Sequence, residues 1–328
     1  MQLKALCSGS VLWMVLTGSA FAAQSDSVDQ WLQRLQNAQS KQGYQGTFVY
    51  ERKGAFSSHQ VWRQVDAQGQ LLERFVQLNG PEHEVMRVDG RVTCMSAVVA
   101  DDLVAADIWP AQTFKLSHVQ QWYDVHLLGE TRVAGHLTSV LLFSPRDQHR
   151  YPVEIYVDQT TAIPLKTLLL NERGELLERL QFIQFQAEAN RTQDSAERLT
   201  ITPSADCLPI LTSTPVKTKE IDVDWNVSWV PPGFKLLKTH YKQSTDSAEY
   251  VLSQVYSDGV AHFSVFFENI DNLEVEGGRH QLGPTAVVSR KVVRSDANIM
   301  ITVVGEIPLG SAERIALSMY SSQEFSDD

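Results

Sequence analysis

Apolar and polar residues alternate along most of this chain with the period of β-strands, after a short stretch with the period of a helix. In residues 28–40 five apolar side chains fall on one face, which predicts an amphipathic helix. From Tyr44 the period changes to two, and pairs typical of hairpin turns, such as Lys53-Gly54 and Asn79-Gly80, separate the apolar segments. The predicted strands of this region are residues 47–50, 59–63, 71–76, 84–88, 123–128, 138–143, 151–157, 165–170 and 176–185. We expect them to form a long antiparallel meander.

Two segments interrupt this pattern. Residues 101–122 are less regular and predict a helix and loops near Trp109. Residues 190–222 lie in a stretch rich in Thr, Ser, Ala, Asn and Pro with few aromatic residues, and we place a linker between two domains there. The expected N-terminal domain then covers residues 23–189, and the expected C-terminal domain covers residues 223–328.

The C-terminal region returns to strand patterns and ends in a helical one. The predicted strands are residues 234–240, 249–256, 261–268, 285–293 and 299–304. Residues 310–319 predict a helix with Ser311 as its N-cap and Glu313 in its first turn. The expected fold is therefore mainly β, with a large antiparallel sheet followed by a smaller α+β domain.

The first residues have the pattern of an exported protein. Lys4 precedes a mostly apolar stretch up to Thr17, and Ala20-Phe21-Ala22 supplies small residues at a cleavage site. This arrangement predicts a signal peptide over residues 1–22, with cleavage near Ala22.

Charge and composition narrow the classes of partner. The chain has 28 Lys and Arg against 39 Asp and Glu, a formal net charge of -11. A nucleic-acid binder needs a concentrated basic face to neutralise phosphates, and no run of basic residues supplies one. We therefore expect no nucleic-acid partner.

Two cysteines, Cys94 and Cys207, remain after the predicted cleavage. In an oxidising compartment they can form one intramolecular disulfide, which would fasten the linker onto the first domain. Two buried free thiols are the alternative. A metal site is not expected, because neither cysteine has a His or another Cys close by at ligand spacing.

Motifs for catalysis are not found in the sequence. It contains no phosphate-binding loop, no dinucleotide fingerprint and no nucleophile elbow, and Arg87 stands where a zinc-protease motif starting at His83 would need its second His. His59, His126 and His149 are expected on the surface or in hairpins rather than as ligands. We expect no enzyme and no cofactor, although a triad built from distant residues stays open. The aromatic residues of the first sheet indicate either a filled core or a cavity for an apolar ligand.

Dispersed segments in matching order resemble the RseB/MucB family, and its MucB branch in particular. The segments that carry the resemblance are residues 46–52, 88–91, 144–151, 164–172, 229–234, 258–266 and 281–285. The resemblance implies a periplasmic negative regulator of the sigma-E (AlgU-type) envelope-stress response. It also implies an N-terminal half-barrel like those of the lipoprotein carriers LolA and LolB, and a C-terminal domain that helps to bind an anti-sigma factor of the RseA/MucA type.

In such a protein the anti-sigma factor is shielded from site-1 proteolysis and is released when lipid or lipopolysaccharide binds. Coupling requires that the lipid-filled state hold the anti-sigma factor less well than the empty state. The residues that we expect to line the lipid cavity are Phe48, Tyr50, Trp62, Met86, Trp109, Phe143 and Ile155. The residues that we expect to bind the partner are Glu51, Arg52, Arg146, Asp147, Arg150, Pro232 and Phe234.

Two functions remain at this point. The first is an interaction protein that regulates proteolysis, and the second is a periplasmic carrier of lipid or lipoprotein that uses the same half-barrel. The separate C-terminal domain favours the first, because a carrier has no evident need for it. A homo-oligomer remains open.

Overall fold

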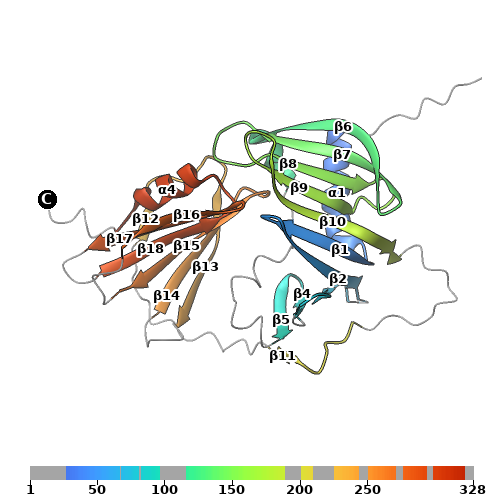
Figure 1. The fold of residues 1–328 in the computed structure, drawn as a ribbon, viewed down its shortest axis with the longest axis horizontal. Coiled ribbons are helices and arrows are strands. Elements are labelled where there is room, and N and C mark those ends of the chain that lie inside the picture. The colour runs from blue at the N-terminus through green and yellow to red at the C-terminus, as the bar shows by residue number, and fades with distance from the viewer. Residues whose placement is uncertain are drawn as a thin grey trace, which may run out of the picture.

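The computed structural model contains two large β-sheets, each with a helix packed against it, and one small two-stranded sheet (Figure 1). The structure describes residues 27–66, 68–80, 83–96, 116–188, 201–209, 225–243, 250–270, 276–293 and 298–321. The predicted signal peptide and Trp109 lie outside these ranges. No helix among the described residues is long and apolar enough to span a membrane.

The first sheet has eleven strands, in the order β11-β5-β4-β3-β2-β1-β10-β9-β8-β7-β6. Its strands are β1 (Tyr44–Arg52), β2 (Ala55–Val65), β3 (Leu71–Gln77), β4 (Glu84–Val88), β5 (Arg91–Ser96), β6 (Tyr123–Val133), β7 (His136–Pro145), β8 (Val153–Asp158), β9 (Pro164–Leu170), β10 (Leu176–Ala187) and β11 (Cys207–Pro209). The predicted antiparallel sheet is confirmed, but it consists of two meanders rather than one. They join where β1 pairs with β10, so chain segments about 130 residues apart form the middle of the sheet.

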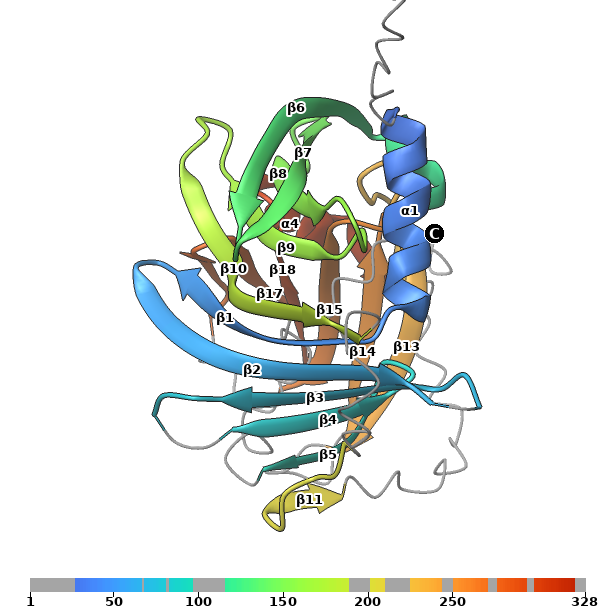
Figure 2. The same ribbon diagram turned by 90° about the vertical axis from the view of Figure 1, so that its right-hand side faces the viewer.

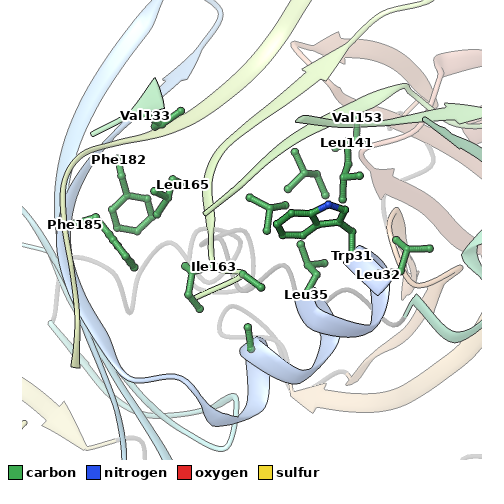
Figure 3. Packing of buried hydrophobic residues seen from close by; sticks show 14 of the residues in the cluster. Trp31, Leu32, Leu35, Val133, Leu141, Val153, Ile163, Leu165, Phe182 and Phe185 are labelled. Atoms are coloured by element: carbon green, nitrogen blue, oxygen red, sulfur yellow. The ribbon is translucent and has the colours of Figure 1, made fainter. Parts of the chain in front are cut away.

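Helix α1 (Val28–Lys41) begins at a capping box. The Ser27 hydroxyl accepts a hydrogen bond from the Gln30 backbone N–H, and the Gln30 side chain accepts one from the Ser27 backbone. The apolar face of the helix, with Trp31 and Leu35, packs against the concave side of the curved sheet (Figures 2 and 3). The amphipathic pattern in the sequence therefore corresponds to a helix that covers the open side of a half-barrel.

Segment 201–209 packs against the far edge of the first sheet. Strand β11 pairs with β5, and a disulfide joins Cys94 to Cys207 with their Cα atoms 5.5 Å apart. The backbone N–H of Ser204 donates to the buried carboxylate of Glu84, 3.1 Å away. Part of the region that the sequence assigns to the linker is thus a strand of the first sheet. The possible bridge between Cys94 and Cys207 indicated this attachment, but a strand of three residues is too short to show apolar alternation in the sequence.

The second sheet has six strands, in the order β13-β14-β15-β18-β17-β16. They are β13 (Lys235–Gln243), β14 (Tyr250–Ser257), β15 (His262–Asn269), β16 (Gly278–Leu282), β17 (Thr285–Val293) and β18 (Asn298–Gly305), with β12 (Trp225–Val227) and β19 (Met319–Ser321) forming a separate pair. Strand β16 was missed because it is mostly exposed and lacks apolar alternation.

Helix α4 (Leu309–Ser318) covers this second sheet and buries Ala312, Ile315 and Ala316. The prediction that Ser311 caps it is wrong: the N-cap is Pro308, which has no capping side chain. Ser311 lies in the first turn of the helix instead, where its hydroxyl contacts His149 of the first domain.

Breaking the disulfide should destabilise the first domain measurably. We expect the Cys94→Ser/Cys207→Ser double variant to lower the free energy of unfolding by about 2–4 kcal/mol, because the bridge closes a long loop in the unfolded chain. Urea unfolding of the full chain, followed by Trp fluorescence, measures the change. Wild-type protein treated with reductant should unfold at the same urea concentration as the variant, and an unchanged midpoint in both would contradict the prediction.

Candidate functional site

The two domains meet at two clusters of buried and partly buried charged side chains, and these clusters are the candidate functional site. The first, which we call the Arg150 cluster, contains Asp147, Arg150, Pro232 and Asp258. The second, which we call the Arg52 cluster, contains Tyr50, Arg52, Glu178, Thr285 and Glu306. Each cluster joins residues more than 80 positions apart in the sequence.

Arg150, in the turn after β7, places its guanidinium wholly out of solvent between the domains. Its Nε donates to Asp258 Oδ2 at 2.5 Å, and its terminal nitrogens donate to the Asp147 carboxylate and to the backbone carbonyl of Pro232. Asp258 is equally buried, and its other oxygen accepts from the backbone N–H groups of Val260 and Ala261, each at 2.8 Å. All the charges of this cluster are therefore paired and hydrogen-bonded.

Aromatic rings enclose the Arg150 guanidinium. It lies 4.9 Å from the ring centroid of Phe234 and 5.5 Å from that of Trp122, within the range of cation–π attraction. Burial disfavours the charged form, but the hydrogen bonds and charges of Asp258 and Asp147 outweigh it and raise the pKa of Arg150 above its usual value. Gly233, with φ +91°, presses so close to Trp122 that a Cβ would lie 2.3 Å from the indole.

His149 adds a contact next to the Arg150 cluster. Its Nδ1 is 2.9 Å from the hydroxyl of Ser311 at the start of α4, and its ring meets Trp229 edge to face with centroids 5.1 Å apart. Burial lowers the pKa of His149, so the neutral ring is favoured. The sequence-based expectation of a surface or hairpin residue overlooked this contact between domains.

The Arg52 cluster lies where the end of β1 meets the second sheet. Arg52 Nε is 3.2 Å from Glu178 Oε2 of the first domain, and its terminal nitrogen is 3.1 Å from Glu306 Oε1 of the second. The same nitrogen donates to the Thr285 hydroxyl at 2.7 Å. Tyr50 donates its hydroxyl to Glu178 Oε2, also at 2.7 Å. One guanidinium therefore serves two carboxylates that come from different domains.

Burial strongly affects the titration of this cluster. It raises the pKa of Glu178 to about 7, with a further contribution from the negative charge of Glu306. It also raises the pKa of Glu306, although the positive charge of Arg52 opposes the shift. The pKa of the Tyr50 hydroxyl is raised as well, by burial and then by Glu178. Tyr50 thus stays a hydrogen-bond donor over the whole physiological range.

The predicted lipid-cavity residues fall into three places. Phe48, Phe143 and Ile155 belong to the buried cluster between the first sheet and α1, and Tyr50 packs against it. Met86 belongs to a separate cluster with the disulfide on the other side of β4. Trp62 lines a pocket of about 20 Å³ beside Ile201. The assignment of these residues to lipid binding remains a prediction.

One histidine inside the half-barrel was expected on the surface or in a hairpin. His59 of β2 is fully buried, its ring stacks on Phe48 with centroids 5.2 Å apart, and its Nε2 lies 2.7 Å from the Ser57 hydroxyl. Burial, helped by the nearby His83, lowers the pKa of His59 to about 3. His59 is therefore neutral in this core. The described residues contain no group of three or more His, Cys, Asp or Glu side chains that could hold a metal ion.

Most predicted partner-binding residues make contacts within the chain. Arg52, Asp147, Arg150 and Pro232 hold the domains together, and Phe234 is buried against Phe263 and the Arg150 guanidinium. The other two pair within the first domain: Glu51, whose side chain is only 17% exposed, pairs with Arg179 at 2.5 Å, and the half-exposed Arg146 pairs with Asp124 at 2.7 Å. Their role in partner binding remains a prediction.

The acceptors that pair with these arginines were missed. Asp258 is followed by Gly259, a pair that indicates a turn, and Glu178 and Glu306 are single acidic residues with no motif around them. Only the arrangement of the two domains reveals their partners.

Comparisons with known proteins cover both domains. A model described as the MucB/RseB N-terminal domain matches residues 27–202, and one described as the MucB/RseB C-terminal domain matches residues 219–320. The chain is 44% identical over 310 residues to the sigma factor AlgU regulatory protein MucB of Pseudomonas aeruginosa, covering 93% of this chain and 96% of the relative. It is 27% identical over 317 residues to the sigma-E factor regulatory protein RseB of Escherichia coli K12, covering 95% and 94%.

Solved structures agree with this similarity. The complex of Pseudomonas aeruginosa MucA and MucB matches with a TM-score of 0.74 and 44% identity, covering 89% of this chain and 97% of that one. A second structure, described as MucB in complex with MucA(peri), also has a TM-score of 0.74, with 42% identity and coverage of 90% and 99%.

Removing the Arg150 guanidinium should separate or destabilise the domains. We expect Arg150→Met to cost about 3–5 kcal/mol, because Asp258 is then left charged and buried without its partner. The matched control is Arg146→Met, which removes an exposed ion pair and should cost at most about 1 kcal/mol. Thermal and urea unfolding of both variants measure the difference, and equal losses would show that burial of the Arg150 charge does not set the stability.

Proposed function

The chain belongs to the MucB/RseB family, and on that premise we propose that it is a periplasmic regulator that binds the periplasmic part of a membrane anti-sigma factor of the MucA type. The observation that carries the proposal is similarity over both domains to MucB, a relative whose solved structures include complexes with MucA. Bound in this way, the anti-sigma factor is shielded from the protease that makes the first cut. The predicted signal peptide supports the periplasmic location.

The junction supports binding by both domains together. The Arg150 and Arg52 clusters fix the angle between the two sheets, so surfaces on either side keep a constant spacing. A partner that contacts both domains depends on that spacing even where it does not touch the buried arginines. We therefore assign Arg52 and Arg150 a positioning role, and we assign direct contact to the half-exposed Arg146 and to Glu51, which does not bridge the two domains.

The half-barrel supports the proposal that lipid or lipopolysaccharide releases the anti-sigma factor. The α1 side chains Trp31, Leu32 and Leu35 occupy the space that acyl chains would take on the concave face (Figure 3). Each methylene of an acyl chain that is transferred from water into the half-barrel contributes about 0.8 kcal/mol to the free energy of binding. One fully buried acyl chain can therefore displace the contacts between α1 and the sheet. A lipid that moves α1 changes the binding of the anti-sigma factor only if the lipid-filled and the empty protein differ in their affinity for the anti-sigma factor.

A proteolysis assay tests the regulatory function. The mature chain, residues 23–328, should protect a MucA-type periplasmic fragment from its site-1 protease, and added lipopolysaccharide should restore cleavage. An unrelated fragment cleaved by the same protease serves as the control. Unprotected cleavage, together with transfer of lipid between vesicles, would favour a carrier of the LolA/LolB type instead. The double variant Glu51→Lys/Arg146→Glu should lose protection, and full protection by it would contradict the two contact residues.

The lipid-binding assignment can be tested with two matched enlargements. Ile155→Phe fills the cluster under α1, whereas Met86→Phe fills the separate cluster beside the disulfide. Overpacking at either site costs about 1–3 kcal/mol, so stability changes similarly in both. If acyl chains enter the cluster under α1, only Ile155→Phe should weaken release of the anti-sigma fragment by lipid, measured as the lipid concentration that restores half of the cleavage. Equal weakening by both variants would instead favour a wider cavity that includes Met86, and no effect of either would place the lipid site elsewhere.

A further inference from the structure

We propose that the Arg52 cluster is a proton-operated latch: docking of the second domain onto the first takes up about one proton, so acidification through the neutral range tightens the junction. The proposal concerns the contact between the two domains of this chain. It does not depend on the identity of any partner, and it can fail while the proposed function stands.

The Arg52 cluster contains one positive charge, on Arg52, and two carboxylates, those of Glu178 and Glu306. Within the first domain, Glu178 lies 3.2 Å from Arg52, so one negative charge faces one positive charge. Docking brings Glu306 to 3.1 Å from the same guanidinium. The side chains of Glu178 and Glu306 are only 12% and 17% exposed, so water screens their repulsion poorly. Binding a proton to one carboxylate removes the excess negative charge.

Among the described residues, the members of the Arg52 cluster other than Arg52 and the two carboxylates are neutral hydroxyls. Tyr50 donates to Glu178 and carries no charge, and Thr285 donates or accepts as a neutral hydroxyl. Lys53 packs its aliphatic stem near Gly283, in the turn that precedes Thr285. A positive charge on His262, at the start of β15, lowers the pKa of Glu178 and so opposes the effect, but burial and Glu306 outweigh it. Beside Arg52 on β1, Glu51 pairs with Arg179.

The Arg150 cluster shows why the same behaviour is not expected there. It also contains one arginine and two carboxylates, but backbone N–H groups stabilise both anions: Val260 and Ala261 donate to Asp258, and His149 donates to Asp147. Hydrogen bonds from such donors favour the ionised form of a carboxylate. Among the described residues, the hydrogen bonds to Glu178 and Glu306 come from side chains.

The sign of the effect follows from the raised pKa values. In the docked state burial and the charge of Glu306 raise the pKa of Glu178 to about 7. Separation of the domains removes Glu306 and admits water, so we expect it to return this pKa toward the lower, ordinary carboxylate value. Docking is therefore fully favoured below the ordinary value and loses this contribution as the pH rises through about 7. For one such group, the docking constant rises about tenfold between pH 8 and pH 6.

Energy transfer between fluorophores on the two domains measures the latch. One dye is placed at the exposed Gln68 and the other at the exposed Lys235 through non-canonical residues, so that the Cys94–Cys207 bridge stays intact. The full mature chain is titrated from pH 8.5 to pH 5.5 in a urea concentration below that of global unfolding. We expect the docked fraction of the wild type to be constant above about pH 8 and to rise as the pH falls below about 7.

Two glutamine variants mimic the protonated carboxylates of the Arg52 cluster. Because two variants are used, the test still works if one of them fails to fold. Glu178→Gln and Glu306→Gln should each stay docked at pH 8 and lose most of the tenfold pH response. The control Glu313→Gln removes a carboxylate of the second domain that pairs with Arg279 outside the junction, and it should titrate as the wild type. A wild-type docked fraction that is constant, or that falls on acidification, would overturn the proposal. So would a full pH response in both glutamine variants.

Discussion

The burial of the Arg150 charge between the two domains is the interaction on which the arrangement of this molecule depends. A guanidinium without solvent contact is tolerated only where its hydrogen bonds are met, and here the acceptors come from Asp147 on one side and from Pro232 and Asp258 on the other. The second domain can therefore accept the hydrogen bonds of the Arg150 guanidinium only from a narrow range of positions relative to the first domain. The ring of Phe234 and the close approach of Gly233 to Trp122 restrict that range further.

The sheet of the first domain and its helix create the conditions for this junction. The pairing of β1 with β10 places Arg52 beside Glu178, and the β7–β8 turn presents Arg150 near the same side of the sheet. The packing of α1 over the concave face fills the half-barrel from the other side (Figure 2). The same strands therefore contribute to the core of the first domain and to the junction between the domains. Tyr50 contacts both, because its ring packs against the core and its hydroxyl donates to Glu178.

Local patterns in the sequence predicted the elements well and the junction poorly. Helix α1 was predictable because its apolar spacing and its cap lie within a few residues, and most strands were predictable because alternation and turn pairs are local signals. Ser311 looked like a cap because capping residues are recognised by type, yet its hydroxyl serves a histidine 162 positions away. Arg52 and Arg150 were singled out as partner-binding residues, a role that remains a prediction, and in the structure both join the two domains. Their contacts could not be assigned, because Asp258 and Glu306 become their neighbours only after two separate sheets have formed.

The disulfide has a consequence for the freedom of the second domain. Counted along the backbone from the end of β10 at Ala187 to Trp225, the connection could reach about 130 Å if fully extended. The bridge between Cys94 and Cys207 anchors that path at the far edge of the first sheet, and from Pro209 onward the reach is about 55 Å. The disulfide thus shortens the connection that limits how far the second domain can move from the first. When the junction opens, the second domain can explore a volume about tenfold smaller than it could without the bridge. Its effective concentration near the first domain is higher by the same factor, so it rebinds more readily in competition with any other ligand of the exposed face.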